Sequence, residues 1–147
     1  MVTVFNRLEE ARDLASATQA SHDDNADVQL GLGGWYEQQG ESAKSEACFQ
    51  RAVEIAPDYP PCRRIVAIDQ LGAGKPKEAK TILADFRAPS EYYEPALFIM
   101  LARAFQAQAM YAEALEEYEE VTQNVPELAK DRTIRKEIKR CKKELKR

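Results

Sequence analysis

The sequence predicts an all-α fold in which helix-turn-helix units repeat along the chain. The first observation is composition: among 147 residues, Ala, Glu, Gln, Leu and Lys are abundant, whereas Val, Ile and Thr number only 7, 7 and 5. This balance favours helix over strand. The second is that residues 96–125 contain neither Pro nor Gly, which leaves room for two packed helices. The third is that residues of similar size recur with a period near 34, which is typical of stacked helical units.

The repeat is visible as a fixed order of large and small residues. The first unit places them at Leu32, Gly33, Tyr36, Gly40, Ser45, Phe49, Ala52 and Pro57. A shift of 69 residues gives Leu101, Ala102, Phe105, Ala109, Ala114, Tyr118, Val121 and Pro126. A shift of 34 residues gives the most divergent copy, at Val66, Ala67, Gln70, Gly74, Ala79, Leu83 and Phe86. The sequence therefore predicts three units, at residues 26–59, 60–94 and 95–128.

Each helix can be placed in order. A helix is expected first over residues 4–17, where one face carries Val4, Leu8, Ala11, Leu14 and Ala15. The polar stretch 21–25 suits a loop and a helix N-cap. Paired helices follow at residues 26–39 and 42–55, 61–73 and 76–87, and 95–109 and 111–124. Gly40 and Gly74 suit the turns of the first two pairs, where a positive φ is expected, and Ala109 replaces the third turn glycine.

The C-terminal segment predicts one more helix. Ile134, Ile138, Cys141 and Leu145 are spaced by 4, 3 and 4 residues, which places them on one side of a helix. Stacks of helical units need terminal elements with a polar outer face, so this helix is expected to cap the third unit. The predicted organisation is an N-terminal helix and loop at residues 1–25, repeats at 26–128, and a basic capping helix at 129–147.

This pattern resembles the tetratricopeptide repeat, a helix-turn-helix marked by Leu-Gly, an aromatic residue, Ala, Phe, Ala and a closing Pro. The resemblance covers residues 26–128 and implies an α-solenoid. Small residues would let the paired helices cross closely, namely Gly33, Ala67 and Ala102 opposite Ser45, Ala79 and Ala114. Gln29 and Arg63 depart from the pattern, since the family often has a large aromatic residue there, whereas Phe98 keeps it.

The resemblance implies a concave groove that holds a peptide segment of another protein, as expected of an adaptor, a scaffold or a chaperone-like module. The groove residues it implies are Asp27, Leu30, Gly34, Glu37, Gln38, Arg64, Ile68, Leu71, Ile99, Arg103 and Gln106. Leu30, Ile68, Leu71 and Ile99 would bury apolar anchors. Arg64 and Arg103 would meet a carboxylate or a backbone carbonyl.

One subfamily grips the C-terminal carboxylate of heat-shock chaperones with Lys and Asn at fixed places on this face. Those places hold Leu30, Gly34, Ile65, Ala96 and Met100, so this clamp is absent. Small chaperones of type III secretion are similar in architecture, with three such repeats and flanking helices.

The sequence offers little for catalysis. His22 is the one histidine and lies in an acidic polar loop. Cys48, Cys62 and Cys141 form no C-x-x-C pair, and Cys48 and Cys141 are interpreted as buried apolar residues. The chain is therefore expected to be non-catalytic, with no cofactor or metal. With no apolar run of spanning length and no visible secretory signal, a cytoplasmic protein is expected.

Charge is divided unevenly. Residues 1–128 hold 11 Lys/Arg and 22 Asp/Glu, whereas residues 129–147 hold 10 and 3. The basic end offers an alternative function in assembly or in binding nucleic acid or an anionic membrane, although it has no aromatic residue for stacking or insertion. Self-association as a homo-oligomer is a further alternative. The Glu cluster at Glu113, Glu116, Glu117, Glu119 and Glu120 is interpreted as a solvated helix face that could also meet the basic cap.

Overall fold

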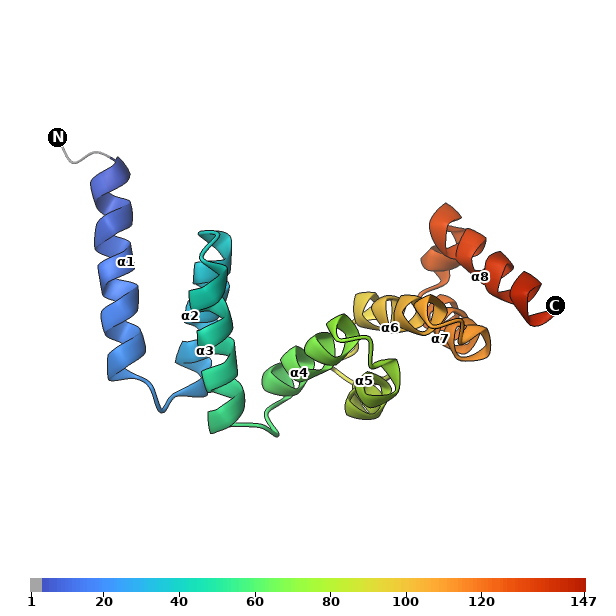
Figure 1. Ribbon diagram of the computed structural model, residues 1–147, viewed down its shortest axis with the longest axis horizontal. Helices are drawn as coiled ribbons and strands as arrows, with labels where there is room; N and C mark the ends of the chain where they lie inside the picture. Colours follow the sequence, from blue (N-terminus) through green and yellow to red (C-terminus); the bar gives the residue numbers. More distant parts are fainter. Residues whose placement is uncertain (1–3) are drawn as a thin grey trace. The chain divides into compact units, whose positions relative to one another are not determined.

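The computed structural model describes residues 4–147, and this part of the chain contains eight α-helices, two 3-10 helices and no strand. In chain order they are α1 (Val4–Ser21), α2 (Ala26–Gln38), α3 (Ser42–Ile55), α4 (Pro60–Gly72), α5 (Pro76–Ile82), η1 (Leu83–Phe86), α6 (Pro95–Ala107), α7 (Tyr111–Asn124), η2 (Pro126–Lys130) and α8 (Arg132–Leu145) (Figure 1). The predicted all-α fold of helical repeats is confirmed for these residues. Of the expected N-terminal segment, residues 1–3 and the side chain of Val4 lie outside the described part.

Several helices begin at a specific start signal in the sequence. The Asn25 side chain accepts a hydrogen bond from the backbone N–H of Val28 at 3.1 Å, so the polar loop ends in the expected N-cap of α2. Pro95 lies in the first turn of α6, where its missing N–H has no partner to lose. The six paired helices begin and end within two residues of expectation, except that α5 gives way to 3-10 geometry after Ile82.

The turns inside the three repeats all use a left-handed residue. The φ angles are 74° at Gly40, 71° at Gly74 and 58° at Ala109. The expectation for both glycines is confirmed. At Ala109 the Cβ atom makes the same conformation less favourable by about 1–2 kcal/mol.

By packing, the chain divides into two compact units, one ending at Ile65 and the other starting at Val66, so the boundary in the sequence falls within α4. In the first unit α2 packs on α3. A Cβ atom built on Gly33 would lie 2.5 Å from a ring carbon of Phe49, so only glycine fits without displacing the ring. Tyr36 and Cys48 are completely buried in the same unit. The expected close helix crossing at Gly33 is confirmed here, and the side chain nearest to Gly33 is that of Phe49.

α1 packs beside α2 through the buried Ala15, which lies in one apolar cluster with Tyr36 and Cys48, and through polar contacts. The hydroxyl groups of Ser16 and Tyr36 lie 3.5 Å apart. Gln29 is completely buried, and its side-chain amide donates to the backbone carbonyls of Gln19 and His22 at 3.3 and 3.1 Å. These carbonyls lie at the end of α1, where a helix leaves its last acceptors without internal partners. The Gln29 departure from the repeat pattern therefore has a structural role.

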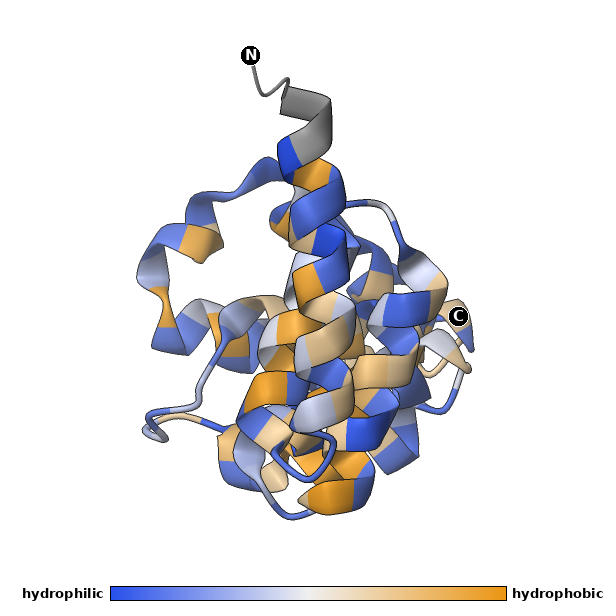
Figure 2. Ribbon diagram, turned by 90° about the vertical axis from the view of Figure 1, so that its left-hand side faces the viewer, coloured by the Kyte–Doolittle hydropathy of each residue, from blue (hydrophilic) through white to orange (hydrophobic). Residues whose placement is uncertain are grey.

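The second unit is built around α6 and α7. The α6 side chains in its core are at most 1% exposed, and they are Leu97, Phe98, Leu101, Ala102 and Phe105. α7 adds Ala114, Tyr118 and Val121, and α8 adds Ile134 and Cys141. Figure 2 shows hydrophilic and hydrophobic residues alternating along the helices, as expected when one side of each helix is buried. Within the described residues, none of the helices combines the length and the hydropathy needed to cross a bilayer.

Candidate functional site

One side of α6 lies at the surface of the second unit and is mostly apolar. Residues spaced three and four apart form this side, which we call the α6 face: Ala96, Ile99, Met100, Arg103, Gln106 and Ala107. Met100 is 40% exposed, Arg103 is exposed and Ile99 is half-buried. Arg103 is the single charged residue among the thirteen of α6, all of which are described. A surface helix normally carries several charges on its outer side, so the composition of the α6 face is unusual.

A polar cluster fixes one end of the α6 face. The Tyr118 hydroxyl donates to the Gln106 side-chain oxygen at 3.1 Å, and the Gln106 amide donates to Glu137 at 2.5 Å. Burial, followed by the charge of Glu137, raises the pKa of Tyr118 to about 12, while Arg103 acts in the opposite direction. Gln106 is thus held by α7 and α8, with the Arg103 guanidinium close by.

The predicted groove residues of α2 lie in the first unit. Asp27, Glu37 and Gln38 are exposed, while Leu30 and Gly34 are half-buried. Asp27 accepts a hydrogen bond from the Tyr59 hydroxyl at 2.9 Å. A Cβ atom built on Gly34 would meet no atom within 4 Å, so helix packing does not explain this glycine.

The predicted groove residues of α4 behave differently from one another. Ile68 is half-buried and packs against the core of the second unit, and Arg64 is half-buried in the first unit. Leu71 is only 9% exposed and belongs to the core itself. The expectation that Leu71 offers an open apolar anchor is therefore wrong. It follows the buried Ala67 by four residues, and this spacing places it on the core side of α4.

The predicted residues Ile68, Ile99, Arg103 and Gln106 thus lie in the second unit. Glu137 was missed, because its place on α8 beside Gln106 depends on how α8 packs and has no signal in the repeat pattern.

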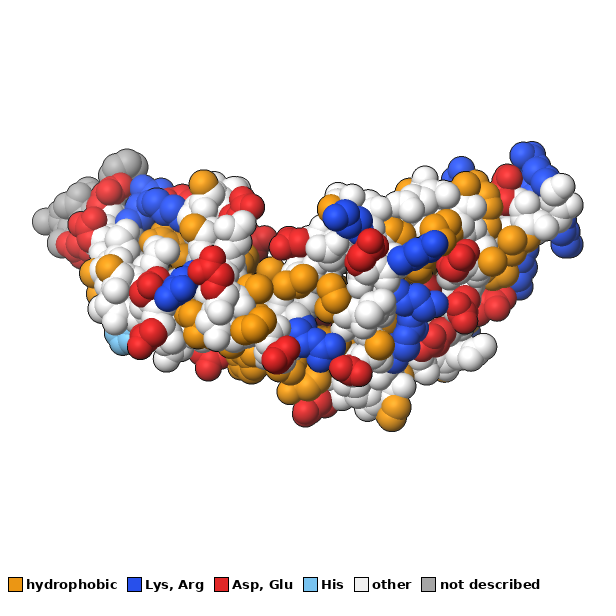
Figure 3. All heavy atoms as spheres, turned by 60° about the horizontal axis from the view of Figure 1, so that its bottom comes forward, with side chains coloured by type: hydrophobic (Ala, Val, Ile, Leu, Met, Phe, Trp, Pro, Cys, Tyr) orange, Lys and Arg blue, Asp and Glu red, His pale blue; other side chains and the backbone are white. Residues whose placement is uncertain are grey.

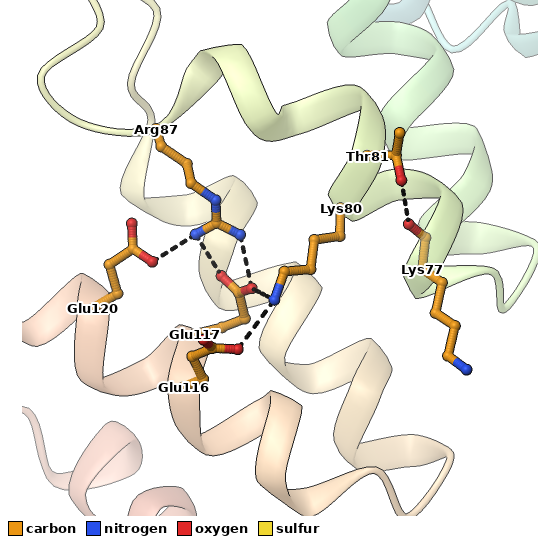
Figure 4. A network of polar contacts seen from close by, with 7 residues as sticks. All are labelled: Lys77, Lys80, Thr81, Arg87, Glu116, Glu117 and Glu120. Carbon is orange, nitrogen blue, oxygen red and sulfur yellow. Dashed lines mark hydrogen bonds and ion pairs between the residues drawn. The ribbon is translucent and has the colours of Figure 1, made fainter.

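The interpretation of the Glu cluster of α7 as a solvated helix face is wrong for Glu117. Glu117 is 0% exposed, not solvated. Arg87 binds both of its carboxylate oxygens, at 2.8 and 3.0 Å, and also pairs with Glu120 at 2.6 Å (Figure 4). Lys80 pairs with Glu117 and Glu116, each at 3.1 Å. We call these five residues the Glu117 network.

This network connects α5 and the residue after η1 to α7. Elsewhere on the surface too, acidic and basic side chains lie next to one another, as the face drawn in Figure 3 shows. Burial lowers the pKa of Lys80, but hydrogen bonds to Glu117 and Glu116 outweigh it and raise the pKa overall. Glu117 lies three residues after the buried Ala114 and four before the buried Val121, and that spacing is a sequence signal for its burial.

The groups that could support covalent chemistry are either exposed or inert. His22 is exposed, and its Nδ1 atom lies 2.9 Å from the Ser21 hydroxyl. Cys48, Cys62 and Cys141 are free and buried, and burial raises the pKa of each thiol. A thiol that resists ionisation is a weak nucleophile. No group of three or more metal-ligating side chains occurs in the described part of the chain.

Paired helices, left-handed turns and close crossings at small residues define a helical repeat protein. Two family models described as tetratricopeptide repeat match residues 26–59 and 96–127. The chain therefore contains tetratricopeptide repeats, at the first and third of the predicted units. Such repeats generally mediate interactions between proteins and are typically non-catalytic modules. No curated protein matches the sequence.

Proposed function

We propose that the chain is a non-catalytic interaction module that binds a segment of another protein against the α6 face. The observation that carries this proposal is the composition of that face: exposed Met100, half-buried Ile99, two alanines, and a single charge at Arg103. A partner that covers exposed apolar surface stabilises the complex by about 25 cal/mol per Å² of surface removed from water.

The partner segment is expected to combine apolar side chains with a carboxylate. Met100 is unbranched and adaptable, which suits an apolar anchor of irregular shape. The Arg103 guanidinium presents a planar set of donors that matches a carboxylate. Gln106 is held by Tyr118 and Glu137 and would present a fixed edge to the segment.

The same register on the first repeat supports a second contact surface on α2. It consists of Asp27, Leu30, Gly34, Glu37 and Gln38, which lie on one side of that helix. Gly34 leaves open space where a partner backbone could approach closely. Adaptor, scaffold and chaperone-like roles all use such surfaces, and they differ in what is bound.

The test is peptide selection followed by affinity measurement. Random-sequence peptides are selected on the immobilised chain, and the affinity of an enriched peptide is measured for the wild type, Met100→Asp and Arg103→Glu. We expect enriched peptides with apolar and acidic residues, and a loss of affinity of about tenfold in each variant.

Lys77→Glu is the matched control for Arg103→Glu, because it also reverses an exposed charge of the second unit. Its affinity should stay within about twofold of the wild type, since rim charges distant from a site contribute little. Equal affinities for the wild type, Met100→Asp and Arg103→Glu would contradict the proposal.

A further inference from the structure

The outer side of α8 carries a continuous row of cations. Seven side chains, spaced three and four apart, form this α8 basic face: Arg132, Arg135, Lys136, Lys139, Lys142, Lys143 and Lys146. All seven are exposed, and together with Ile138 they line one shallow depression. The opposite side of α8 is buried, with Ile134 4% and Cys141 0% exposed. Packing of α8 on α7 therefore turns the cations outward along about 21 Å of helix.

These cations are largely without acidic partners. Among the described residues, Lys142 pairs with Glu119 at 3.1 Å, and the other six have no carboxylate within ion-pair distance. Glu137 and Glu144, the acidic residues within α8, are engaged with Gln106 and Arg147 instead. The α8 basic face thus differs from the Glu117 network, where every cation is paired.

Folding alone does not account for this arrangement. Like charges four residues apart repel one another on a helix, as at Arg132 and Lys136 and again at Lys139 and Lys143. Cations near a helix C-terminus are favourable, which explains Lys142 and Lys143. Cations in the first turns oppose the helix dipole, so Arg132, Arg135 and Lys136 gain nothing from it. An anionic partner would relieve both costs.

We propose that the α8 basic face binds an acidic, partly apolar segment of a partner protein. Two apolar side chains border the cations, half-buried Ile138 and Leu145, which is 49% exposed. They alternate with Arg135 and Lys142 along one edge of the helix at spacings of three and four. A segment that alternates carboxylates with apolar residues complements this edge in both respects.

The other anions fit less well. A phosphate backbone would use the cations but not Ile138 and Leu145, and α8 has no aromatic residue for base stacking. A bilayer surface takes up amphipathic helices through their apolar side, and the centre of that side of α8, at Ile134 and Cys141, is buried in the protein core. The proposal concerns a different helix from the α6 face and does not rest on the function proposed for it.

The experiment measures fluorescence anisotropy of a labelled peptide of about 15 residues in which Glu and Leu recur at helical spacing. Lys139→Gln/Lys143→Gln removes two cations from the centre of the α8 basic face. Lys75→Gln/Lys77→Gln is the matched control, because it removes two exposed lysines of the same unit. Circular dichroism verifies that both variants keep the wild-type helix content.

We expect the dissociation constant to rise about fivefold in Lys139→Gln/Lys143→Gln and to change by less than about 1.5-fold in the control. Replacing Leu by Ser in the peptide should weaken binding by about threefold, because the apolar edge then has no partner. A loss of affinity in Arg103→Glu without a loss in Lys139→Gln/Lys143→Gln would mean that the peptide binds the α6 face instead, so failure of this proposal is distinguishable from failure of the α6 proposal.

Several results would overturn the proposal. One is an equal loss in both double variants, and another is no loss when Leu is replaced by Ser. Tighter binding of an oligothymidine of about the same length, or of phosphatidylserine vesicles, would assign the face to nucleic acid or to a membrane. Self-association that sedimentation detects in the wild type but not in Lys139→Gln/Lys143→Gln would assign it to a second copy of the chain.

Discussion

The two matched repeats share a register but place different chemistry at the same buried position. Cys48 of α3 and Glu117 of α7 are related by the 69-residue shift of the repeat, and both are 0% exposed. The Cys48 thiol is uncharged, and burial alone raises its pKa. The Glu117 carboxylate forms ion pairs with Arg87 and Lys80. Register therefore decides which positions are buried, and neighbouring segments decide which chemistry a buried position tolerates.

Placing the Glu of the third repeat at the matched position of the first repeat should have the largest effect on stability. We expect Cys48→Glu to lower the free energy of unfolding by about 4 kcal/mol, because Arg12, Lys44 and Arg51 of the first unit already pair with other carboxylates. Urea denaturation followed by circular dichroism measures this. Cys48→Ala is the control and should cost about 1 kcal/mol. Similar stabilities of the two variants would contradict this expectation and show that the introduced carboxylate can reach water.

Removing a cation from the Glu117 network should lower the free energy of unfolding by a smaller amount. Arg87→Ala leaves the buried Glu117 with Lys80 as its remaining partner, and we expect a loss of about 2 kcal/mol in urea denaturation. Lys142→Ala removes a cation from the exposed pair with Glu119 and should cost less than about 0.5 kcal/mol. Equal losses would mean that burial does not distinguish the two pairs.

The helix crossing of the first repeat can be tested with adjacent glycines. Gly33→Ala places a Cβ atom 2.5 Å from the Phe49 ring, and we expect overpacking to cost about 2 kcal/mol. Gly34→Ala meets no atom and should stabilise α2 by about 1 kcal/mol. Thermal denaturation of both variants measures the difference. A stabilised Gly33→Ala variant would contradict the close crossing.

At the next matched position the repeats place Phe49 and Tyr118, and only the tyrosine can ionise, which predicts an alkaline loss of stability at this position in the third repeat and not in the first. Burial raises the pKa of Tyr118 from the ordinary tyrosine value near 10 to about 12 in the folded chain, so the folded state keeps this proton to a higher pH than the unfolded state does. This contribution to stability is present below pH 10 and is lost as pH rises toward 12, by about 2 kcal/mol. Urea denaturation at several pH values should show a smaller alkaline loss in Tyr118→Phe than in the wild type.

The smallest effect concerns the turns. Ala109→Gly should raise stability by about 1 kcal/mol, because glycine adopts φ 58° without the steric cost of a Cβ atom. Gly40→Ala should lower it by about the same amount. Ala107→Gly, in the last turn of α6, is the control, and its loss should reflect helix propensity. A destabilised Ala109→Gly variant would mean that the third turn depends on the Ala side chain.

Local chemistry made most of the fold predictable. Gly40 and Gly74 stand where the turns require positive φ, Asn25 starts α2, and the small residue Gly33 marks a helix crossing. The end of α5 at Ile82 was not predicted, because the residues that follow keep a helical pattern of side chains.

The surface was harder to predict, because burial of a polar or apolar side chain depends on segments distant in sequence. Arg87 and Glu117 are 30 residues apart, and the interpretation of Glu117 as solvated ignored its spacing to Ala114 and Val121. Leu71 was assigned to a partner surface from the family register, although its spacing to Ala67 indicates the core. At Leu71, where the family register and the local spacing disagree, the local spacing is correct.

The Glu117 network also constrains how this gene could be rearranged. Repeat proteins gain and lose units by duplication and deletion, which requires that each unit function beside a new neighbour. The third repeat does not meet this requirement, because Glu117 forms ion pairs with Arg87 and Lys80, which belong to the second repeat. Deleting the second repeat alone would leave a buried carboxylate without a counter-charge. The second and third repeats are therefore expected to be inherited and exchanged as a pair.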